Sequence, residues 1–274
     1  MNFLSSTNSH GFHKVKTDVA LPLFPTTNLL YNFSALSGTS TTTNGATIAT
    51  WTDARTGLVG SNYGSSGNCI YHTDVTINSK PTITGAISTI FGNSSTPQNS
   101  WTWYCVLRTF GGTFAGDSFF TYPANDLANG LQIDLYIGNL LLIMTGIAVA
   151  PSPSGTSGGT PSTWYSSINT NYIFTMLCSG SNTTTSSTQT YTYRINGVDY
   201  TPANPTDTAK VFYIANQIVG DKRGSNQYYM GEQTLYNTVH SLATAQTMEQ
   251  YLSNKWQIPI GSTPAIASSS PYSN

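Results

Sequence analysis

The sequence predicts an all-β protein, a two-sheet antiparallel jelly-roll-like sandwich with a short C-terminal helix. Charged residues make up only 8% of the 274 residues and aromatic residues 12%, with 17 Tyr. Tyr, Thr and Val suit a pleated, half-buried surface, whereas Glu and Lys are depleted in strands. Short runs of β-branched and aromatic residues alternate with turn-rich stretches, and only one stretch has helical periodicity.

The expected strands are short and separated by polar loops. Asn196-Gly197 is the strongest hairpin signal, because both central residues of a type I′ turn need a positive φ. The stretch 151–163, PSPSGTSGGTPST, is expected to be a loop. Strands are expected at residues 28–33, 48–52, 101–109, 118–122, 130–137, 140–148, 172–179, 190–195, 211–218 and 228–236.

One amphipathic helix is expected at residues 244–256, TAQTMEQYLSNKW. The residues at helical spacing on one face are Met248, Tyr251, Leu252, Lys255 and Trp256. Pro259 stops the helix from continuing, and Ser241 and Thr244 are the candidate N-caps. We expect this helix to dock on the edge or the back of the sandwich.

The closing segment carries a recognisable motif. It consists of GEQTLYN at residues 231–237, then Leu242, then YLSNKW at residues 251–256. This run resembles the C-terminal signature of concanavalin A-like lectin/glucanase (laminin-G-like) domains, a family found in many phage and viral structural proteins. Trp51-Thr52-Asp53 and Asn196-Gly197 are similar to the early W-x-D and the middle hairpin of that family. The resemblance covers about residues 28–258 and implies a β-sandwich recognition module.

Three regions are expected along the chain. Residues 1–25 are interpreted as an N-terminal arm, 26–260 as one concanavalin-like sandwich and 261–274 as an extended C-terminal tail. The Ser- and Asn-rich ends are expected to be ordered by partner chains or by the domain's own surface. The longest apolar run, residues 140–150, is too short for a bilayer span of about 20 residues. The net charge of −1 argues against nucleic acid as a partner.

Enzymatic chemistry is not expected. Glycoside hydrolysis needs two carboxylates at a fixed separation, and the only two glutamates are Glu232 and Glu249, with no E-x-D-x-x-E motif. Glu232 is interpreted as a structural carboxylate. The three cysteines, Cys69, Cys105 and Cys178, form no C-x-x-C pair, so zinc is not expected and buried free thiols are.

No cofactor is expected, and Ca²⁺ is the one metal ion that the residues allow. Its candidate ligands are Asp53 and Asp221, because carboxylate oxygens suit a hard cation. The alternative for Asp53 is a hydrogen-bonded turn. The alternative for Asp221 is a solvated loop or an ion pair with Lys222 or Arg223.

Glycan binding would need exposed aromatic side chains with polar neighbours. Trp164 and Tyr165, which follow the Gly/Ser/Pro-rich loop, are the best candidates, and Tyr122 and Tyr63 are weaker ones. The alternative for each is packing on the sandwich, because Trp and Tyr are usually largely buried.

Together these features favour a non-enzymatic structural or adhesion component of a viral or phage particle: a capsid, decoration, fibre or tail protein. Its location would be the virion. Its partners would be copies of itself or other virion proteins, contacted through the arm and the tail, and surface glycans. The alternative is a secreted, extracellular carbohydrate-binding module or lectin. A second alternative is a glycoside hydrolase that depends on Glu232.

Overall fold

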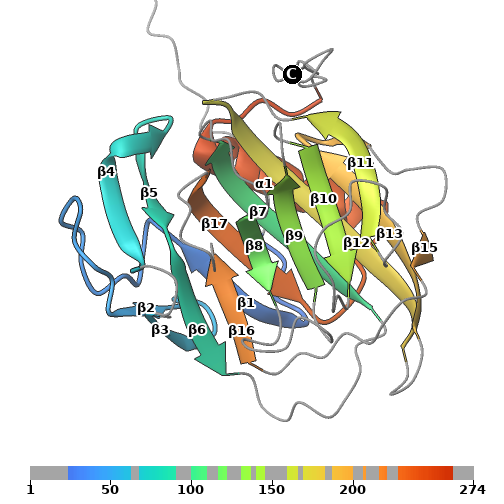
Figure 1. Cartoon of the computed structure of the whole chain (residues 1–274), viewed down its shortest axis with the longest axis horizontal. Helices are drawn as coiled ribbons and strands as arrows, with labels where there is room; N and C mark the ends of the chain where they lie inside the picture. The colour runs from blue at the N-terminus through green and yellow to red at the C-terminus, as the bar shows by residue number, and fades with distance from the viewer. Residues whose placement is uncertain are drawn as a thin grey trace, which may run out of the picture.

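The structure is a computed structural model. It describes residues 24–62, 68–90, 100–109, 117–121, 131–136, 140–145, 159–165, 169–182, 187–199, 206–207, 216–220 and 228–261. Their strands form two antiparallel sheets, and Leu242–Trp256 forms the helix α1 (Figure 1). The predicted antiparallel sandwich with a short C-terminal helix is therefore confirmed.

The first sheet, sheet A, has nine strands. In spatial order its main path is β14 (Val198–Asp199), β13 (Ser187–Ile195), β12 (Asn171–Asn182), β7 (Trp101–Thr109), β17 (Tyr228–Tyr236), β5 (Lys80–Thr84) and β4 (Ile70–Ile77). Two further strands lie off this path: β1 (Leu29–Ser34) pairs with β17, and β15 (Thr206–Asp207) pairs with β13.

The second sheet, sheet B, has eight strands. Their order is β11 (Gly159–Tyr165), β10 (Leu140–Thr145), β9 (Leu131–Tyr136), β8 (Asp117–Thr121), β16 (Asn216–Gly220), β6 (Ala86–Ile90), β3 (Val59–Asn62) and β2 (Thr50–Thr52). Figure 1 shows β8, β9 and β10 in front of β7, β12 and β17, with α1 on the far side of sheet A. The described elements therefore form three layers: sheet B, sheet A and the helix.

Burial of sheet A on both faces explains its composition. Every residue of β7 except Arg108 is buried, although its sequence WTWYCVLRT does not alternate between apolar and polar residues. One face packs toward sheet B, where the rings of Phe33 on β1 and Trp51 on β2 lie 5.3 Å apart. The other face lies under α1, where the Tyr104 hydroxyl is 2.8 Å from Nδ1 of His240. A strand in the middle layer needs large side chains on both faces.

The strands that the sequence predicts best are those with strong local signals. β7 and β17 have the predicted bounds, and Asn196 and Gly197 have φ of 47° and 79°, as the predicted hairpin requires. The strands β3, β4, β5, β6 and β15 were not predicted. The β4–β5 turn uses Asn78 and Ser79 at φ of 49° and 66°, so this left-handed turn lacks the usual glycine.

The predicted loop at residues 151–163 and the two predicted ends have different outcomes. The predicted loop 151–163 is wrong for residues 159–163, which belong to β11 because they pair with β10. Residues 1–23 and 262–274 lie outside the described residues, so the arm, the tail and their partner contacts remain predictions. The last residues of the expected arm do pack on the domain: the ring of Phe24 lies 5.2 Å from that of Tyr251, and the carbonyl of Pro25 accepts a hydrogen bond from Tyr236.

No helix among the described residues is both long and apolar enough to cross a membrane.

Candidate functional site

The helix α1 begins and ends with specific caps. Ser241, one of the two predicted N-cap candidates, is the N-cap. Its hydroxyl accepts a hydrogen bond from the Thr244 amide at 3.2 Å. The helix therefore starts two residues earlier than expected. Gln257 ends it in the left-handed conformation, and Lys255 lies in the last turn, where a cation favours the helix dipole.

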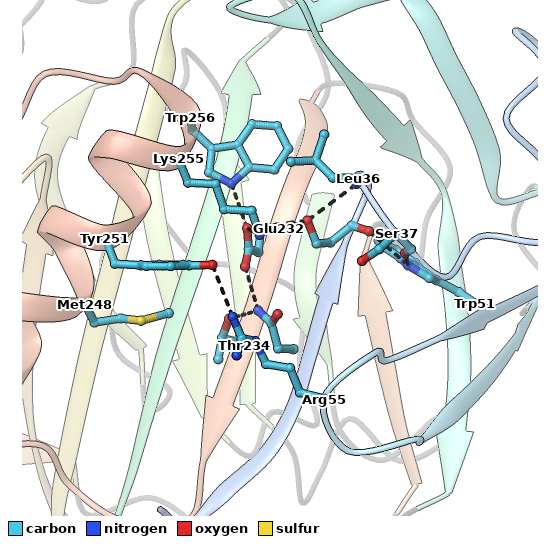
Figure 2. Close-up of polar contacts among 12 residues, drawn as sticks. Leu36, Ser37, Trp51, Arg55, Glu232, Thr234, Met248, Tyr251, Lys255 and Trp256 are labelled. Atoms are coloured by element: carbon cyan, nitrogen blue, oxygen red, sulfur yellow. Dashed lines mark hydrogen bonds and ion pairs between the residues drawn. The ribbon is translucent and has the colours of Figure 1, made fainter. Parts of the chain in front are cut away.

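The end of α1 converges on one buried carboxylate, that of Glu232 on β17 (Figure 2). Its Oε2 accepts a hydrogen bond from Trp256 Nε1 at 2.7 Å and forms an ion pair with Lys255 Nζ at 2.7 Å. Its Oε1 accepts from Asn32 Nδ2 at 2.7 Å. Glu232 is 1% exposed. We call Glu232, Asn32, Lys255 and Trp256 the Glu232 cluster.

The Glu232 cluster joins three segments that are distant in the sequence. Asn32 belongs to β1, Glu232 to β17, and Lys255 and Trp256 to α1. The Trp256 ring also lies directly over Gly231, where an added Cβ would come within 2.9 Å of the ring. A buried carboxylate is tolerated only when it is paired and hydrogen-bonded, and both conditions hold here. The cluster therefore fastens the helix to sheet A.

A second buried ion pair fastens the middle of α1. Arg194 on β13 and Glu249 form a two-pronged contact, with Nε to Oε1 at 2.8 Å and Nη2 to Oε2 at 3.0 Å. The side chains are 7% and 1% exposed. The hydrogen bonds to Glu249 raise the pKa of Arg194. This is the geometry in which guanidinium–carboxylate pairs are strongest.

These two ion pairs contain both glutamates that the hydrolase alternative could use. A glycosidase needs one carboxyl group to deliver a proton and a second to attack or to activate water, and both must reach the substrate. Glu232 and Glu249, the only glutamates in the chain, are both 1% exposed and each is bound to a cation. The structural interpretation of Glu232 agrees with this geometry.

His240 lies in a third polar contact between sheet A and the start of α1. Its amide donates to Thr102 Oγ1 at 2.8 Å, and its ring lies 4.2 Å from that of Tyr236. Burial lowers the pKa of His240 to about 4. The imidazole is therefore neutral in the folded protein at neutral pH.

We expect His240 to make stability depend on acid pH. In the unfolded chain the imidazole takes up a proton near pH 6.5, whereas the folded protein resists protonation until about pH 4. Protons therefore favour the unfolded state, and stability falls as the pH drops from 6.5 toward 4. Urea denaturation at pH 7.0 and 4.5 should show a smaller decrease for His240→Asn than for the wild type. An equal decrease in both proteins would contradict this assignment.

Asp53 lies in the turn that follows β2. Its carboxylate accepts hydrogen bonds from the amides of Asn32 and Arg55, both at 2.8 Å, and from the Thr56 hydroxyl. These contacts match the alternative of a hydrogen-bonded turn. Within the described part of the chain, no group of three or more His, Cys, Asp or Glu is placed to hold a metal ion. The other candidate, Asp221, lies outside the described residues.

The predicted aromatic candidates fall in different places. Trp164 and Tyr165 lie on β11, the edge strand of sheet B, and not in a loop as expected. The reason is tertiary, since a Gly/Ser/Pro-rich segment becomes a strand by pairing with β10. Tyr122 and Tyr63 lie outside the described residues.

The backbone pairing of sheet B defines its outer face. Trp51 and Gly60 are paired and buried toward sheet A, whereas their neighbours Thr50 and Ser61 are paired and exposed. From there, directly paired residues continue across every strand of the sheet. This outer row consists of Thr50, Ser61, Ser88, Ile218, Thr121, Gln132, Met144 and Gly159. Directly paired residues share a face, so the whole row lies on the face opposite to sheet A.

Two tyrosines share this face at the β9–β11 end. Residues two apart on a strand lie on the same face, so Asp134 and Tyr136 share the outer face with Gln132. Leu140 pairs with Tyr136 on one side and with Tyr165 on the other. We call Tyr136 and Tyr165 the tyrosine pair.

The strand pairing is irregular at Trp164. Leu142 pairs with Pro161 and Leu140 with Tyr165, so residues 162–164 lie opposite Leu141 alone. The pairing therefore assigns Tyr165, but not Trp164, to the outer face. No signal in the sequence marks Tyr136, because only the register of β9 against β10 brings it beside Tyr165.

Comparisons with known proteins support the fold. No family model and no curated protein matches the sequence. Domain 4 of AbnA, an extracellular GH43 arabinanase from Geobacillus stearothermophilus, matches with a TM-score of 0.54 and 12% identity, over 82% of this chain and 98% of that domain. A Trypanosoma rangeli sialidase matches with a TM-score of 0.51 and 11% identity, over 84% of this chain but only 33% of the sialidase. The chain thus spans about a third of the sialidase, and at this identity the likeness shows the fold alone.

These neighbours contradict the predicted role as a structural component of a viral or phage particle, because they belong to a sialidase and an arabinanase. That prediction depended on the low charge, on the polar ends and on the family resemblance. A nearly uncharged, hydroxyl-rich surface suits glycan contact as well as it suits packing in a particle, so composition could not separate the two roles.

Proposed function

We propose that this chain is a non-catalytic carbohydrate-binding module of the concanavalin A-like type, and that the outer face of sheet B is its ligand surface. One observation carries the proposal. The outer row runs across all eight strands, and the tyrosine pair lies on the same face at one end of it. The described helix covers the other sheet.

The chemistry of this face fits sugars. Ser, Thr and Gln can both donate and accept hydrogen bonds, as sugar hydroxyls do. Tyr offers an apolar ring for the C–H face of a pyranose or furanose, together with a polar hydroxyl. Thr50 and Ser61 are exposed, and Val59, at 50% exposed, lies on the same face two residues before Ser61. Mixed polar and apolar contacts of this kind are what a neutral ligand with many hydroxyls requires.

The structural neighbours add support. Domain 4 of AbnA, which this chain matches over nearly all of that domain, was solved in complex with arabinotriose. The Trypanosoma rangeli sialidase was solved with a nononic acid derivative. A non-catalytic role is favoured by the two glutamates, which are bound to Arg194 and Lys255 in the helix–sheet layer.

Glycan binding should depend on the tyrosine pair. We expect the intact chain to bind at least one class of oligosaccharide on a broad array that includes arabino-oligosaccharides. Tyr136→Ala and Tyr165→Ala should each weaken that binding about tenfold, which corresponds to about 1.4 kcal/mol. Trp164→Ala should be measured beside them to establish whether this residue also contacts the glycan. Titration calorimetry with the best glycan gives the affinities.

Leu242→Ala provides the control. Leu242 is 54% exposed at the start of α1, in the layer farthest from sheet B, so its replacement should leave the affinity unchanged. Thermal denaturation of each variant checks that the fold is intact. Absence of binding to every glycan on the array, or equal binding by wild type and both tyrosine variants, would reject the proposed surface.

A further inference from the structure

Sheet B is free of cationic residues. None of the residues in its eight strands is Lys or Arg, and two, Asp117 and Asp134, are acidic. Asp134 lies on the outer face between Gln132 of the outer row and Tyr136 of the tyrosine pair. By this register the outer face combines hydroxyl and amide positions with apolar ones such as Ile218 and Met144, and Asp134 is its one acidic position among the paired residues.

Four of the five cationic residues that the structure describes make contacts elsewhere, and the fifth, Lys80, lies on β5 of sheet A. Lys255 and Arg194 are paired with Glu232 and Glu249. Arg108 on β7 donates to the Thr76 carbonyl at 2.8 Å. Arg55 lies over the Phe24 ring, with its Cζ 3.6 Å from the ring centroid, and donates to the Tyr251 hydroxyl at 3.2 Å. Arg55 lies in the turn after β2 and contacts residue 24 and the helix, whereas the contacts of the other three lie in sheet A or between sheet A and the helix. None of these cations belongs to a strand of sheet B.

Acidic glycans need the opposite arrangement. Proteins recognise the carboxylate of a sialic or uronic acid, or a sulfate ester, chiefly through the charge-assisted hydrogen bonds of Arg and Lys. A carboxylate on the protein surface disfavours a second negative charge nearby, and salt weakens this repulsion. A face with Asp134 and no cation in its strands disfavours such ligands.

We propose that this surface selects neutral glycans and discriminates against anionic ones. The inference rests on the proposed function and names its ligand class. The Trypanosoma rangeli sialidase, a third of which matches this chain, was solved with a nononic acid derivative. The fold alone does not determine the charge of a ligand.

The test compares related pairs of glycans in which one member is neutral and the other carries carboxylates. Suitable pairs are N-acetyllactosamine with its sialylated form, and methyl-esterified with de-esterified galacturonan oligomers, all at low ionic strength. For every pair in which the intact chain binds, the neutral member should bind at least tenfold more tightly. Raising the salt concentration to 0.5 M should narrow that ratio, because repulsion between exposed charges is screened.

A charge variant tests the source of the selectivity. Asp134→Asn should raise the affinity for the anionic member several-fold and leave that for the neutral member within twofold. The matched control is Asp74→Asn, which removes the same charge from a 62% exposed side chain on sheet A and should change neither affinity. The salt dependence tests the same point without any variant.

The outcomes separate the two proposals. If no glycan of either kind binds, the proposed function fails, and this inference fails with it. If anionic glycans bind as tightly as their neutral partners or more tightly, the inference about charge is overturned while the carbohydrate-binding function stands.

Discussion

Glu232→Gln is expected to lower the free energy of unfolding by about 3 kcal/mol, within the range measured when one partner of a buried ion pair is removed. The carboxylate is 1% exposed and holds both Lys255 Nζ and Trp256 Nε1 at 2.7 Å. Glutamine has the same shape, but its amide carries no charge to balance the Lys255 ammonium. Urea denaturation at pH 7, followed by tryptophan fluorescence, measures the change.

Two variants of α1 provide a control and a complementary test of this ion pair. Gln250→Ala, at an exposed position of the same helix, should change stability by less than about 0.5 kcal/mol. Lys255→Met should destabilise at least as much as Glu232→Gln, because it leaves the more deeply buried of the two charges without its cation: Lys255 is 18% exposed and Glu232 1%. A change below about 1 kcal/mol for Glu232→Gln would show that the cluster does not fasten the helix.

Glu249→Gln is expected to be as damaging, at about 3–5 kcal/mol. Arg194 is 6% exposed and loses the two hydrogen bonds of 2.8 and 3.0 Å that balance its charge. A guanidinium cannot escape this by releasing its proton, because its pKa exceeds that of every other side chain. The loss of stability should appear in the same denaturation assay.

The double variant Arg194→Met/Glu249→Leu tests whether charge or packing dominates at this ion pair. Replacing both members of a buried ion pair by apolar side chains of similar size is often neutral or stabilising. We expect the double variant to be closer to the wild type than Glu249→Gln is, and the coupling between the two sites to be large. If the double variant is instead as unstable as the sum of both single changes, packing rather than charge dominates at this position.

The stability and binding experiments address different layers of the molecule. The Glu232 cluster and the Arg194–Glu249 pair lie between α1 and sheet A, whereas the outer row and the tyrosine pair lie on sheet B. Variants of the two ion pairs should therefore reduce the folded fraction without changing the affinity of the folded protein for a glycan. The helix and sheet A form the support on which the proposed binding face is built.

The elements that the sequence predicts correctly are those that depend on local chemistry. The β-propensity of residues 101–109 and 228–236 defined β7 and β17, Asn196-Gly197 defined a hairpin, and the Met-Tyr-Leu-Trp spacing defined α1. Together these features were enough to predict the sandwich. Each depends on backbone preferences or on periodicity within a few residues, so no long-range contact is needed to predict it.

The roles of the charged and aromatic residues depend on contacts between strands that are distant in the sequence. Asn32 and Glu232 are 200 residues apart in sequence and meet because β1 pairs with β17. Tyr136 and Tyr165 share a face because both strands pair with β10, and a shift of one residue in that register would place one of them on the opposite face. Register and layer order are long-range properties, and they separate the buried glutamates that brace the helix from the face proposed to bind a glycan.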